Sequence, residues 1–290
     1  MTRTHFDRSS TTIDYFADLD QVVALAVAED LGAGDLTALL IPANTMTHAT
    51  VVVREQGVLC GTRWFDAVYR AVDPDVEVSW LAADGDTVHP DQTLCQLSGR
   101  ARALVSGERT ALNFLQTLSG TASVAARHAA ELAGTRTRLL DTRKTLPGLR
   151  RAQKYAVRCG GGFNHRCGLF DGVLIKENHI AAAGGIGAAI RGLRQAGVTV
   201  PIEVEVEQLS QIEEAIDAGA DMLLLDNFDL ATMANAVSLT AGRVPLEASG
   251  GFSLEDLKAV AATGVDYISS GALTKHVRAI DLSMRIADPD

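Results

Sequence analysis

Residues 141–179 gather positive charge in a chain that is otherwise acidic. This window holds eight arginines and lysines against three acids, a net charge of +5, whereas the whole chain of 290 residues carries −10. Arg143, Arg166 and Lys176 stand in separate segments of the window. Guanidinium groups bind carboxylate and phosphate oxygens with a planar fork, and lysine adds a compact charge. Because such cations repel one another without an anion, we predict a pocket for a small, multiply charged anion. Surface ion pairs with neighbouring acids are the alternative.

Two of the later apolar runs carry an acidic residue at or next to their C-terminal end. These acids are Glu205 in IEVEV and Asp226 in MLLLD. Carboxylate oxygens suit Mg²⁺ that is shared with substrate phosphates and keeps its remaining waters. They also suit ribose hydroxyls or a developing positive charge. We therefore predict that both acids take part in the chemistry, and an ion pair with the nearby cations is the alternative.

Small residues end the last two apolar runs. Glycines let backbone N–H groups approach an oxyanion, and a following helix N-terminus adds a favourable dipole. These segments therefore predict a phosphate site, and they are Ser249-Gly250-Gly251 and Ser270-Gly271-Ala272. His165, just before Arg166, is expected either to orient or hydrogen-bond a ligand or to be satisfied by the loop backbone.

A repeated unit must position these residues. Apolar runs alternate with helical stretches such as QLSQIEEAIDAGA and SLEDLKAVAATG, which predicts right-handed βαβ units in a parallel sheet or barrel, with strands buried on both faces. Function in such barrels gathers at the carboxyl ends of the strands, where every run here carries charge or Gly-Ser. The predicted strands are residues 138–141, 172–176, 202–206, 222–226, 244–248 and 266–270.

The first hundred residues read differently. A helical stretch over 13–31 precedes short alternating runs broken by turns, which are typical of antiparallel strands. The run ADGDTVHPDQTLCQLSG resembles the hairpin of biotinyl and lipoyl carrier domains, but no lysine precedes Lys144, so a carrier function is excluded. In the basic helix LRRAQKYAVR we expect Arg150, Arg151, Lys154 and Arg158 to lie on a solvated face.

Composition excludes several classes of protein. Apolar residues make up 47% and charged residues 21%, as in ordinary globular proteins, and no uncharged apolar stretch approaches the ~18–20 residues that span a bilayer. The polar N-terminus shows no secretory signal, and the acidic balance argues against nucleic acid. The four cysteines lack metal-ligand spacing, so we expect free thiols in a cytoplasmic protein, with any reactivity of Cys159 or Cys167 left open.

The central motifs are DTRKTLPGLR at 141–150 and KYAVRCGGGFNHRCGLFDGVLIKENH at 154–179. They resemble those of the quinolinate phosphoribosyltransferase family, and the resemblance runs from about residue 20 to the C-terminus. A departure is Ser269-Ser270, where the family more often has valine before Gly-Ala. The resemblance implies an N-terminal α/β sandwich (1–110, joined by a C-terminal strand over 277–290) and an incomplete α/β barrel of fewer than eight strands (111–276). The matching segments are GERTALNFLQTLSGTAS, DTRKTLPGLR, KYAVRCGGGFNHRCGLFDGVLIKENH, EVEVE, LLLDNF, EASGGF and SSGALTKH.

The resemblance also implies a reaction: phosphoribosyl pyrophosphate (PRPP) and quinolinate give nicotinate mononucleotide, pyrophosphate and CO₂, with Mg²⁺ and no organic cofactor. By similarity, the quinolinate carboxylates are bound by Arg143, Arg166 and Lys176. His165 lies nearby, and Thr142 belongs to the substrate site. Lys144 would face the pyrophosphate, Glu205 and Asp226 the ribose and Mg²⁺, and the two Ser/Gly segments the 5′-phosphate. Arg109 would reach into the site of a neighbouring subunit, so a homodimer with shared sites is implied.

Three other functions are weighed against this one. A paralogous phosphoribosyltransferase-like protein of molybdenum-related operons shares the TRKT and HR elements but lacks the IKENH arrangement found here at 175–179. A barrel lyase or isomerase of a sugar phosphate would need one or two lysines rather than several convergent cations. A non-catalytic phosphate-binding module would gain nothing from Glu205 and Asp226.

Overall fold

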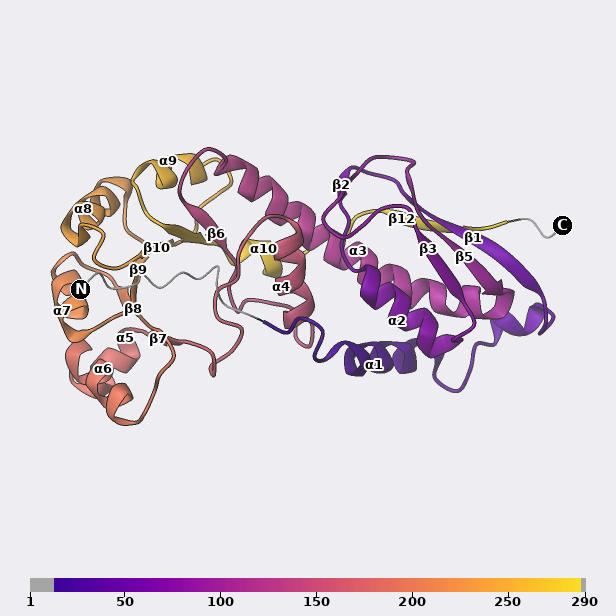
Figure 1. Cartoon of the computed structure of the whole chain (residues 1–290), viewed down its shortest axis with the longest axis horizontal. Coiled ribbons are helices and arrows are strands. Elements are labelled where there is room, and N and C mark those ends of the chain that lie inside the picture. Colours follow the sequence, from indigo (N-terminus) through magenta and orange to yellow (C-terminus); the bar gives the residue numbers. More distant parts are fainter. Residues whose placement is uncertain (1–12, 288–290) are drawn as a thin grey trace. The chain divides into compact units, whose positions relative to one another are not determined.

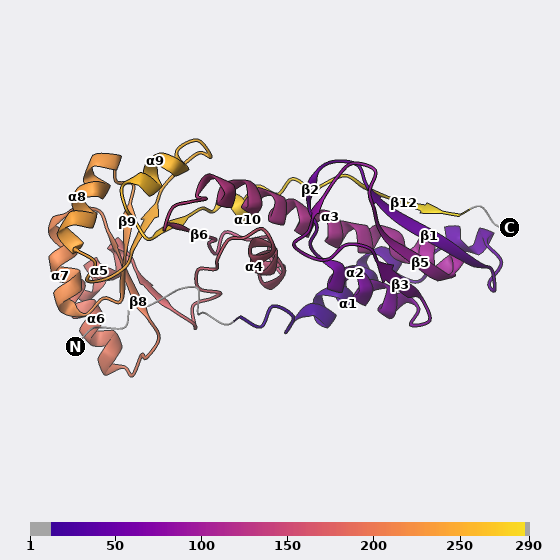
Figure 2. The ribbon, with the colours of Figure 1, turned by 45° about the horizontal axis from the view of Figure 1, so that its top comes forward.

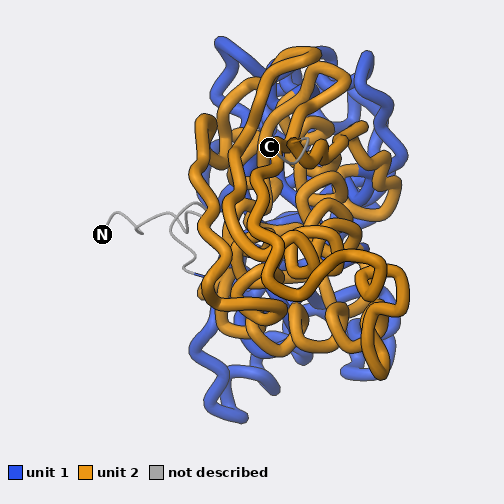
Figure 3. The backbone as a smooth tube through the Cα atoms, turned by 90° about the vertical axis from the view of Figure 1, so that its right-hand side faces the viewer, with its two compact units in different colours: residues 1–13, 127–144, 162–272 blue, residues 14–126, 145–161, 273–290 orange. Residues whose placement is uncertain are grey.

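The computed structural model describes residues 13–287. The chain forms two compact units (Figure 3). The barrel unit contains residues 127–144 and 162–272, and the sandwich unit contains residues 14–126, 145–161 and the C-terminal segment from 273. Each unit therefore draws on segments that lie far apart in the sequence.

The sandwich unit is built on a four-stranded antiparallel sheet of order β12-β1-β5-β3. Along β1, side chains alternate between buried and less buried, as expected for a sheet with one face on a core. The strands are β1 (Met46–Val53), β3 (Glu77–Trp80), β5 (Thr93–Arg100) and β12 (Leu282–Ile286), with a separate pair β2 (Gly57–Val58) and β4 (Thr87–Val88). The prediction that the C-terminal strand joins the N-terminal sheet is confirmed, because β12 pairs antiparallel with β1.

Helices cover one face of this sheet (Figures 1 and 2). The buried core between the layers takes Trp64, Phe65 and Tyr69 from α2 and several leucines from α3 and β5. Burying aromatic and leucine side chains contributes roughly 1.5–3 kcal/mol each, which makes this layer the main support of the unit. All helices of this unit, whether or not they lie on the sheet, are α1 (Leu19–Leu31), the 3₁₀ helix η2 (Thr37–Leu40), α2 (Thr62–Val72), α3 (Ala101–Glu131), α4 (Arg150–Cys159) and α10 (Ala272–Lys275).

The barrel unit is built on a six-stranded parallel sheet of order β6-β11-β10-β9-β8-β7. All five residues of β8 are buried, which confirms the predicted burial on both faces. The strands are β6 (Arg138–Leu140), β7 (Val173–Ile175), β8 (Ile202–Val206), β9 (Met222–Asp226), β10 (Leu246–Ser249) and β11 (Tyr267–Ser269). The predicted incomplete α/β barrel with fewer than eight strands is thus confirmed.

Helices follow the strands of the barrel unit and line its outer side (Figure 1). The inner side holds a small buried cluster of Leu140, Met222 and Tyr267, against which Phe163 packs. These helices are α5 (Glu177–Ala183), α6 (Ile186–Gln195), α7 (Ser210–Ala218), α8 (Leu230–Thr240) and α9 (Leu257–Ala262). The alternation of strand and helix carries every strand end to one edge of the sheet.

The predicted domain boundaries differ from the observed units. We placed the boundary at residue 110, but that position lies inside the continuous helix α3, whose residues 101–126 belong to the sandwich unit. The segment 145–161, which contains α4, also belongs to the sandwich unit rather than to the barrel. An amphipathic helix does not reveal in which unit its buried face packs, so the sequence pattern left this assignment unspecified.

Two helices also depart from expectation. Helix α1 begins at Leu19 rather than at residue 13, because the Asp14 carboxylate accepts the Phe16 N–H at 3.1 Å in a local turn that competes with the helix. Our prediction that the four cations of α4 share a solvated face is wrong for Lys154, which is fully buried. Helix α4 buries residues on more than half of its circumference, so position 154 falls inside the packed region.

All four cysteines are free thiols, as expected, and Cys60, Cys95 and Cys167 are buried. Burial raises the pKa of the Cys60 and Cys95 thiols well above the ordinary value. Among residues 13–287, no helix has the length and apolar character that crossing a membrane requires.

Candidate active site

Strand register brings the predicted site residues to one face and one edge of the parallel sheet. Glu205 of β8 lies level with Leu224 of β9, and Asp226 lies level with Ser249 of β10. Since side chains alternate along a strand, residues two apart face the same side. Glu205, Asp226 and Ser249 therefore project on a common side near the carboxyl ends of β8, β9 and β10, as the sequence predicted.

The Lys176–Glu205 pair is the best-defined contact at this edge. The Lys176 ammonium lies 2.7 Å from a carboxylate oxygen of Glu205, and the Lys176 side chain is 46% exposed against 7% for Glu205. Burial raises the pKa of Glu205, the neighbouring Lys176 lowers it, and the nearby charge of Asp226 raises it again. The ion-pair alternative is therefore observed for Lys176, although nearly half of its side chain stays exposed.

Arg143 follows β6 and carries an unsatisfied donor. Its Nε is buried and has no hydrogen-bond partner among the described residues. A buried donor without an acceptor costs free energy, so native structures rarely keep one unless another group supplies the acceptor. A bound anion would supply the acceptor that the Arg143 Nε lacks.

The loop between α4 and β7 holds Arg166 rigidly. The guanidinium Nη1 donates to the Gly172 carbonyl at 2.9 Å, and only 9% of the residue is exposed. The Asp171 carboxylate accepts the backbone N–H groups of Cys167 at 2.6 Å and Gly168 at 2.8 Å. Asp171 therefore shapes the loop instead of neutralising a rim cation, which argues against surface pairing for this acid.

His165 is satisfied within the protein. Its Nδ1 accepts the backbone N–H of Arg166 at 2.7 Å, and its Nε2 lies 2.9 Å from a carboxylate oxygen of Glu203. The backbone N–H of His165 donates to Asp141 at 2.9 Å. Of the two roles considered for His165, this geometry favours the one in which its partners come from the protein.

The segments after β6 and β11 touch each other. A Cβ placed on Gly271 would lie 2.8 Å from Cδ of Lys144 and 3.4 Å from Oγ1 of Thr142. The Thr142 hydroxyl also accepts the backbone N–H of Lys144 at 3.1 Å. The lack of a side chain at residue 271 therefore lets Lys144 lie against this strand end, as the prediction of a shared site requires.

The other predicted small residues differ in their surroundings. No heavy atom lies within 4 Å of a Cβ placed on Gly251, whereas at Gly250 the ring of Phe252 lies 3.1 Å away. The Ser270 hydroxyl accepts the N–H of Ala272 at 3.3 Å, which opens the short helix α10. The binding of phosphate by these segments stays a prediction.

Arg109 belongs to the sandwich unit. It lies on α3 with its side chain 58% exposed, and a guanidinium nitrogen is 3.9 Å from a carboxylate oxygen of Glu108. Such an exposed pair contributes little stability, so the side chain is available for another contact. Its participation in a neighbouring subunit's site stays a prediction.

Glu203 and Glu247 are polar site neighbours that the sequence reasoning missed. Both carboxylates are buried on inward-facing strand positions, at 1% and 0% exposure. The signal was present in IEVEV, where Glu203 stands two residues before Glu205 and so shares its face. An acid inside an apolar strand deserves attention as a buried partner.

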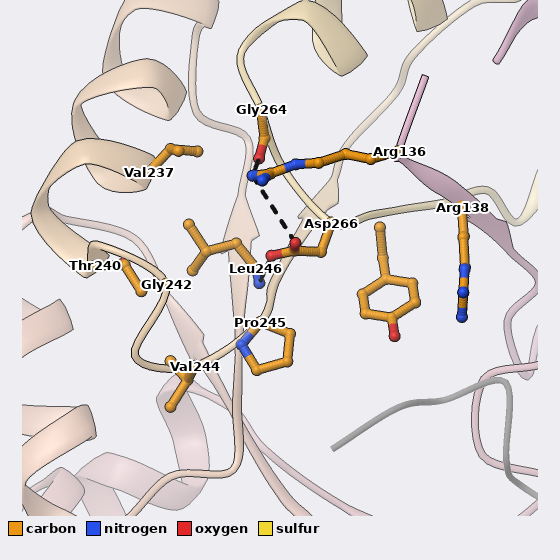
Figure 4. Close-up of a pocket in the computed structure, with 11 residues that line it drawn as sticks. Arg136, Arg138, Val237, Thr240, Gly242, Val244, Pro245, Leu246, Gly264 and Asp266 are labelled. Atoms are coloured by element: carbon orange, nitrogen blue, oxygen red, sulfur yellow. Dashed lines mark hydrogen bonds and ion pairs between the residues drawn. The ribbon is translucent and has the colours of Figure 1, made fainter. Parts of the chain in front are cut away.

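A cavity of about 530 Å³ lies at the opposite edge of the parallel sheet (Figure 4). Its walls include Arg138, Leu246 and Tyr267, which are the first residues of β6, β10 and β11. Arg136 reaches across it to the Gly264 carbonyl and lies 3.9 Å from Asp266. This cavity is therefore separate from the carboxyl-end rim where the predicted site residues gather.

Comparison with known proteins agrees with this geometry. Residues 35–119 match the model of the quinolinate phosphoribosyl transferase N-terminal domain, and residues 121–285 match that of the C-terminal domain.

Individual relatives cover nearly the whole chain. A probable nicotinate-nucleotide pyrophosphorylase [carboxylating] of Bacillus subtilis is 44% identical over 259 residues, which cover 89% of this chain and 90% of that protein. A chloroplastic nicotinate-nucleotide pyrophosphorylase [carboxylating] of Oryza sativa subsp. japonica is 40% identical, covering 93% of this chain and 78% of that protein.

Solved structures give the same answer. The nicotinate-nucleotide pyrophosphorylase from Francisella tularensis superposes with a TM-score of 0.91 at 43% identity, covering 98% of this chain and 100% of that one. Both family models, the high identities and the shared fold lead to one conclusion: this chain belongs to the quinolinate phosphoribosyltransferase family.

Proposed function

We propose that this chain transfers the phosphoribosyl group of PRPP to quinolinate with loss of CO₂, giving nicotinate mononucleotide and pyrophosphate in NAD biosynthesis. The observation that carries the proposal is the buried, unsatisfied Nε of Arg143 at a strand-end rim that also bears Lys176 and Lys144. A dianionic ring supplies the acceptor that Arg143 lacks. Family membership supports the same substrates.

Quinolinate binding falls to Arg143, Arg166 and Lys176. The two arginines offer paired N–H donors to the ring carboxylates, and Lys176 adds a charge that its pairing with Glu205 keeps in place. Arg166 is held by the Gly172 carbonyl before any ligand arrives. A fixed guanidinium loses little side-chain entropy on binding, which favours affinity.

PRPP binding falls to the other strand ends. Lys144, with Thr142 beside it, faces the pyrophosphate, and the Ser249 and Ser270 segments face the 5′-phosphate. Glu205 and Asp226 face the ribose. The close packing of Lys144 against Gly271 supports placing both phosphate groups along neighbouring strands.

Glu205 and Asp226 also fit Mg²⁺. They are hard oxygen donors on neighbouring strands and on one side of the sheet, since Glu205 lies level with Leu224, two residues before Asp226. Mg²⁺, held there mainly through the substrate, would neutralise charge on the pyrophosphate. We infer no organic cofactor, because a leaving pyrophosphate and a quaternary ring nitrogen provide the driving force for both bond changes.

The chain's residues then act by charge and orientation. Lys144 stabilises the negative charge of the departing pyrophosphate as the bond from C1′ to its oxygen breaks, and Glu205 and Asp226 stabilise positive charge on the ribose. The quinolinate nitrogen forms the new bond to C1′. With that nitrogen quaternary, the 2-carboxylate leaves as CO₂, its electron pair stays on the ring carbon, and that carbon takes a proton. The arginines hold the ring in line throughout.

We further propose a homodimer in which Arg109 completes the site of the neighbouring subunit. Its exposed position on α3 supports this role. An Arg109→Ala chain and an Arg166→Ala chain, each impaired alone, should together regain about a quarter of the wild-type activity when mixed, because half of the dimers are then mixed and each of these has one intact site. Two folded variants that regain nothing would contradict sharing.

The free thiols support a cytoplasmic location.

Incubation of purified protein with quinolinate, PRPP and Mg²⁺ tests the proposed reaction directly. We expect equal amounts of CO₂ and nicotinate mononucleotide, and no product without PRPP. Product with another base, and none with quinolinate, would refute the assignment and favour the paralogous transferase. Arg166→Ala should weaken quinolinate binding at least about tenfold, the effect of losing one charge-assisted hydrogen bond.

A further inference from the structure

Inside the parallel sheet lies a group of three side chains that the proposed chemistry does not use. His165, Glu203 of β8 and Glu247 of β10 are at most 6% exposed, and one potential ligand atom from each lies within 4.8 Å of the others. Buried charged groups are retained in proteins where hydrogen bonds or partners compensate them. The contacts of the His165 ring indicate what the group does.

The ring of His165 has a defined tautomer. A neutral imidazole has one N–H donor and one acceptor nitrogen. Because Nδ1 accepts the Arg166 backbone N–H at 2.7 Å, the ring proton belongs on Nε2, which points at Glu203 at 2.9 Å. Glu247 is farther from Nε2, at 3.6 Å. The Glu203 carboxylate is therefore the acceptor that selects this tautomer.

The same contacts argue against a metal ion at this position. A metal bound to Nε2 would move the remaining ring proton to Nδ1. Nδ1 would then be unable to accept the Arg166 N–H, which is the shorter of the two ring contacts. The observed arrangement is thus a hydrogen-bond network in which His165 links a strand to a loop.

That network fixes consecutive residues of the loop. The Asp141 carboxylate, which is fully buried, accepts the Asn164 side-chain N–H at 2.7 Å and the His165 backbone N–H at 2.9 Å. The His165 ring then holds the backbone of Arg166, whose guanidinium donates to Gly172. Together these hydrogen bonds hold the backbone and the guanidinium of Arg166 in one position.

We propose that Glu203 is a positioning residue for quinolinate binding. By accepting the Nε2 proton of His165, it keeps Nδ1 available to the Arg166 backbone and so sets the place of the Arg166 guanidinium. Glu203 does not touch substrate in this role. The inference rests on the proposed binding of quinolinate by Arg166. Glu203 acts on that contact through His165, which holds the Arg166 backbone.

Substitution of Glu203 by an apolar residue of similar length tests the role. Glu203→Met should raise the KM for quinolinate about tenfold, the effect of misplacing one charged hydrogen bond, while the KM for PRPP stays within about twofold. Glu247→Met is the matched control, since it also removes a buried acid but not the ring's nearest acceptor. Equal losses in the two variants, or equal rises in both KM values, would overturn the proposal.

Replacements of His165 separate its two nitrogens. An asparagine oxygen takes the place of Nδ1, whereas a glutamine carboxamide reaches the place of Nε2. His165→Asn should therefore keep the quinolinate KM within about threefold, and His165→Gln should raise it about as much as Glu203→Met. In the His165→Asn background, Glu203→Met should add less than about a twofold change. Equal losses in both His165 variants would refute the role, because the effect would then not depend on which ring nitrogen is replaced.

A spectroscopic readout on the unmodified protein is independent of activity. The ¹⁵N chemical shifts of His165 should report a bare Nδ1 and a protonated Nε2 before any substrate is added. A protonated Nδ1 would refute the inference even if the enzyme turns over quinolinate. Conversely, the expected tautomer in a protein that does not use quinolinate would contradict the proposed function alone.

Discussion

Replacing Lys176 by methionine should destabilise the protein in a way that depends on pH. The ammonium of Lys176 lies 2.7 Å from Glu205, whose side chain is only 7% exposed. Without the cation, the nearly buried carboxylate must either stay charged without its partner or take up a proton. Both alternatives cost free energy at neutral pH.

The size of the effect follows from the exposure of the two groups. Breaking a fully buried ion pair from one side costs about 3–5 kcal/mol. Since the Lys176 side chain is 46% exposed, water already screens part of the attraction, and we expect about 1–2 kcal/mol. A loss of this size lowers the melting temperature by roughly 2–6 °C in proteins of this size range.

The pH dependence distinguishes this cause from a general packing defect. Burial raises the pKa of Glu205 above its ordinary value, and Lys176 opposes that rise. Below the unfolded pKa, Glu205 is protonated in both states and needs no cation. As pH rises through the folded pKa, ionisation becomes costly without Lys176, so the deficit of Lys176→Met should be small in acid, below the ordinary glutamate pKa of about 4.3, and should grow as the pH rises to neutral.

Thermal unfolding of four proteins completes the test: wild type, Lys176→Met, Glu205→Gln and the double variant. The double variant should recover most of the loss at neutral pH, because neither charge is then left behind. A Lys176→Met deficit that is the same at both ends of the pH range, or that persists in the double variant, would refute the ion-pair reasoning. Activity should fall in all three variants, since both residues belong to the proposed site.

Other substitutions probe the fold and the site separately. Gly271→Ala should raise the KM for PRPP about tenfold with little effect on that for quinolinate, since the new Cβ would lie 2.8 Å from Lys144; unchanged PRPP kinetics would contradict the contact. Gly120→Ala should cost about 2–4 kcal/mol by denaturant unfolding, because its Cβ would lie 2.2 Å from a backbone carbonyl oxygen. Tyr155→Phe should cost about 1 kcal/mol at neutral pH by removing the 3.0 Å hydrogen bond to Asp84, whose pKa burial raises, and the cost should shrink on acidification; a pH-independent loss would show a different cause.

Local patterns in the sequence were sufficient to place the strands and most of the rim. Apolar runs of three to five residues became β6 to β11, and the acids that ended two of them, Glu205 and Asp226, face the same side. Register follows from connectivity in a parallel sheet, because each right-handed crossover places the next strand end at the same edge.

Burial of polar groups was not predictable in the same way. Lys154 stands in a helix that reads as basic and solvated, and Glu203 stands in a strand that reads as apolar, yet both are buried. Their environment is set by residues far away in the sequence, such as His165 opposite Glu203. The unit to which α4 belongs is likewise decided by tertiary packing rather than by its own pattern.

The division of the chain into alternating segments constrains how this protein can be taken apart. The sandwich unit is encoded by the segments 14–126, 145–161 and 273 onward, with barrel residues between them. No single cut in the gene therefore yields either unit as one uninterrupted polypeptide. During synthesis, β1 of the antiparallel sheet must wait for its partner β12 until residues 282–286 have been made. Exchange of one unit with an unrelated protein is therefore difficult, and we expect the two units to be inherited together.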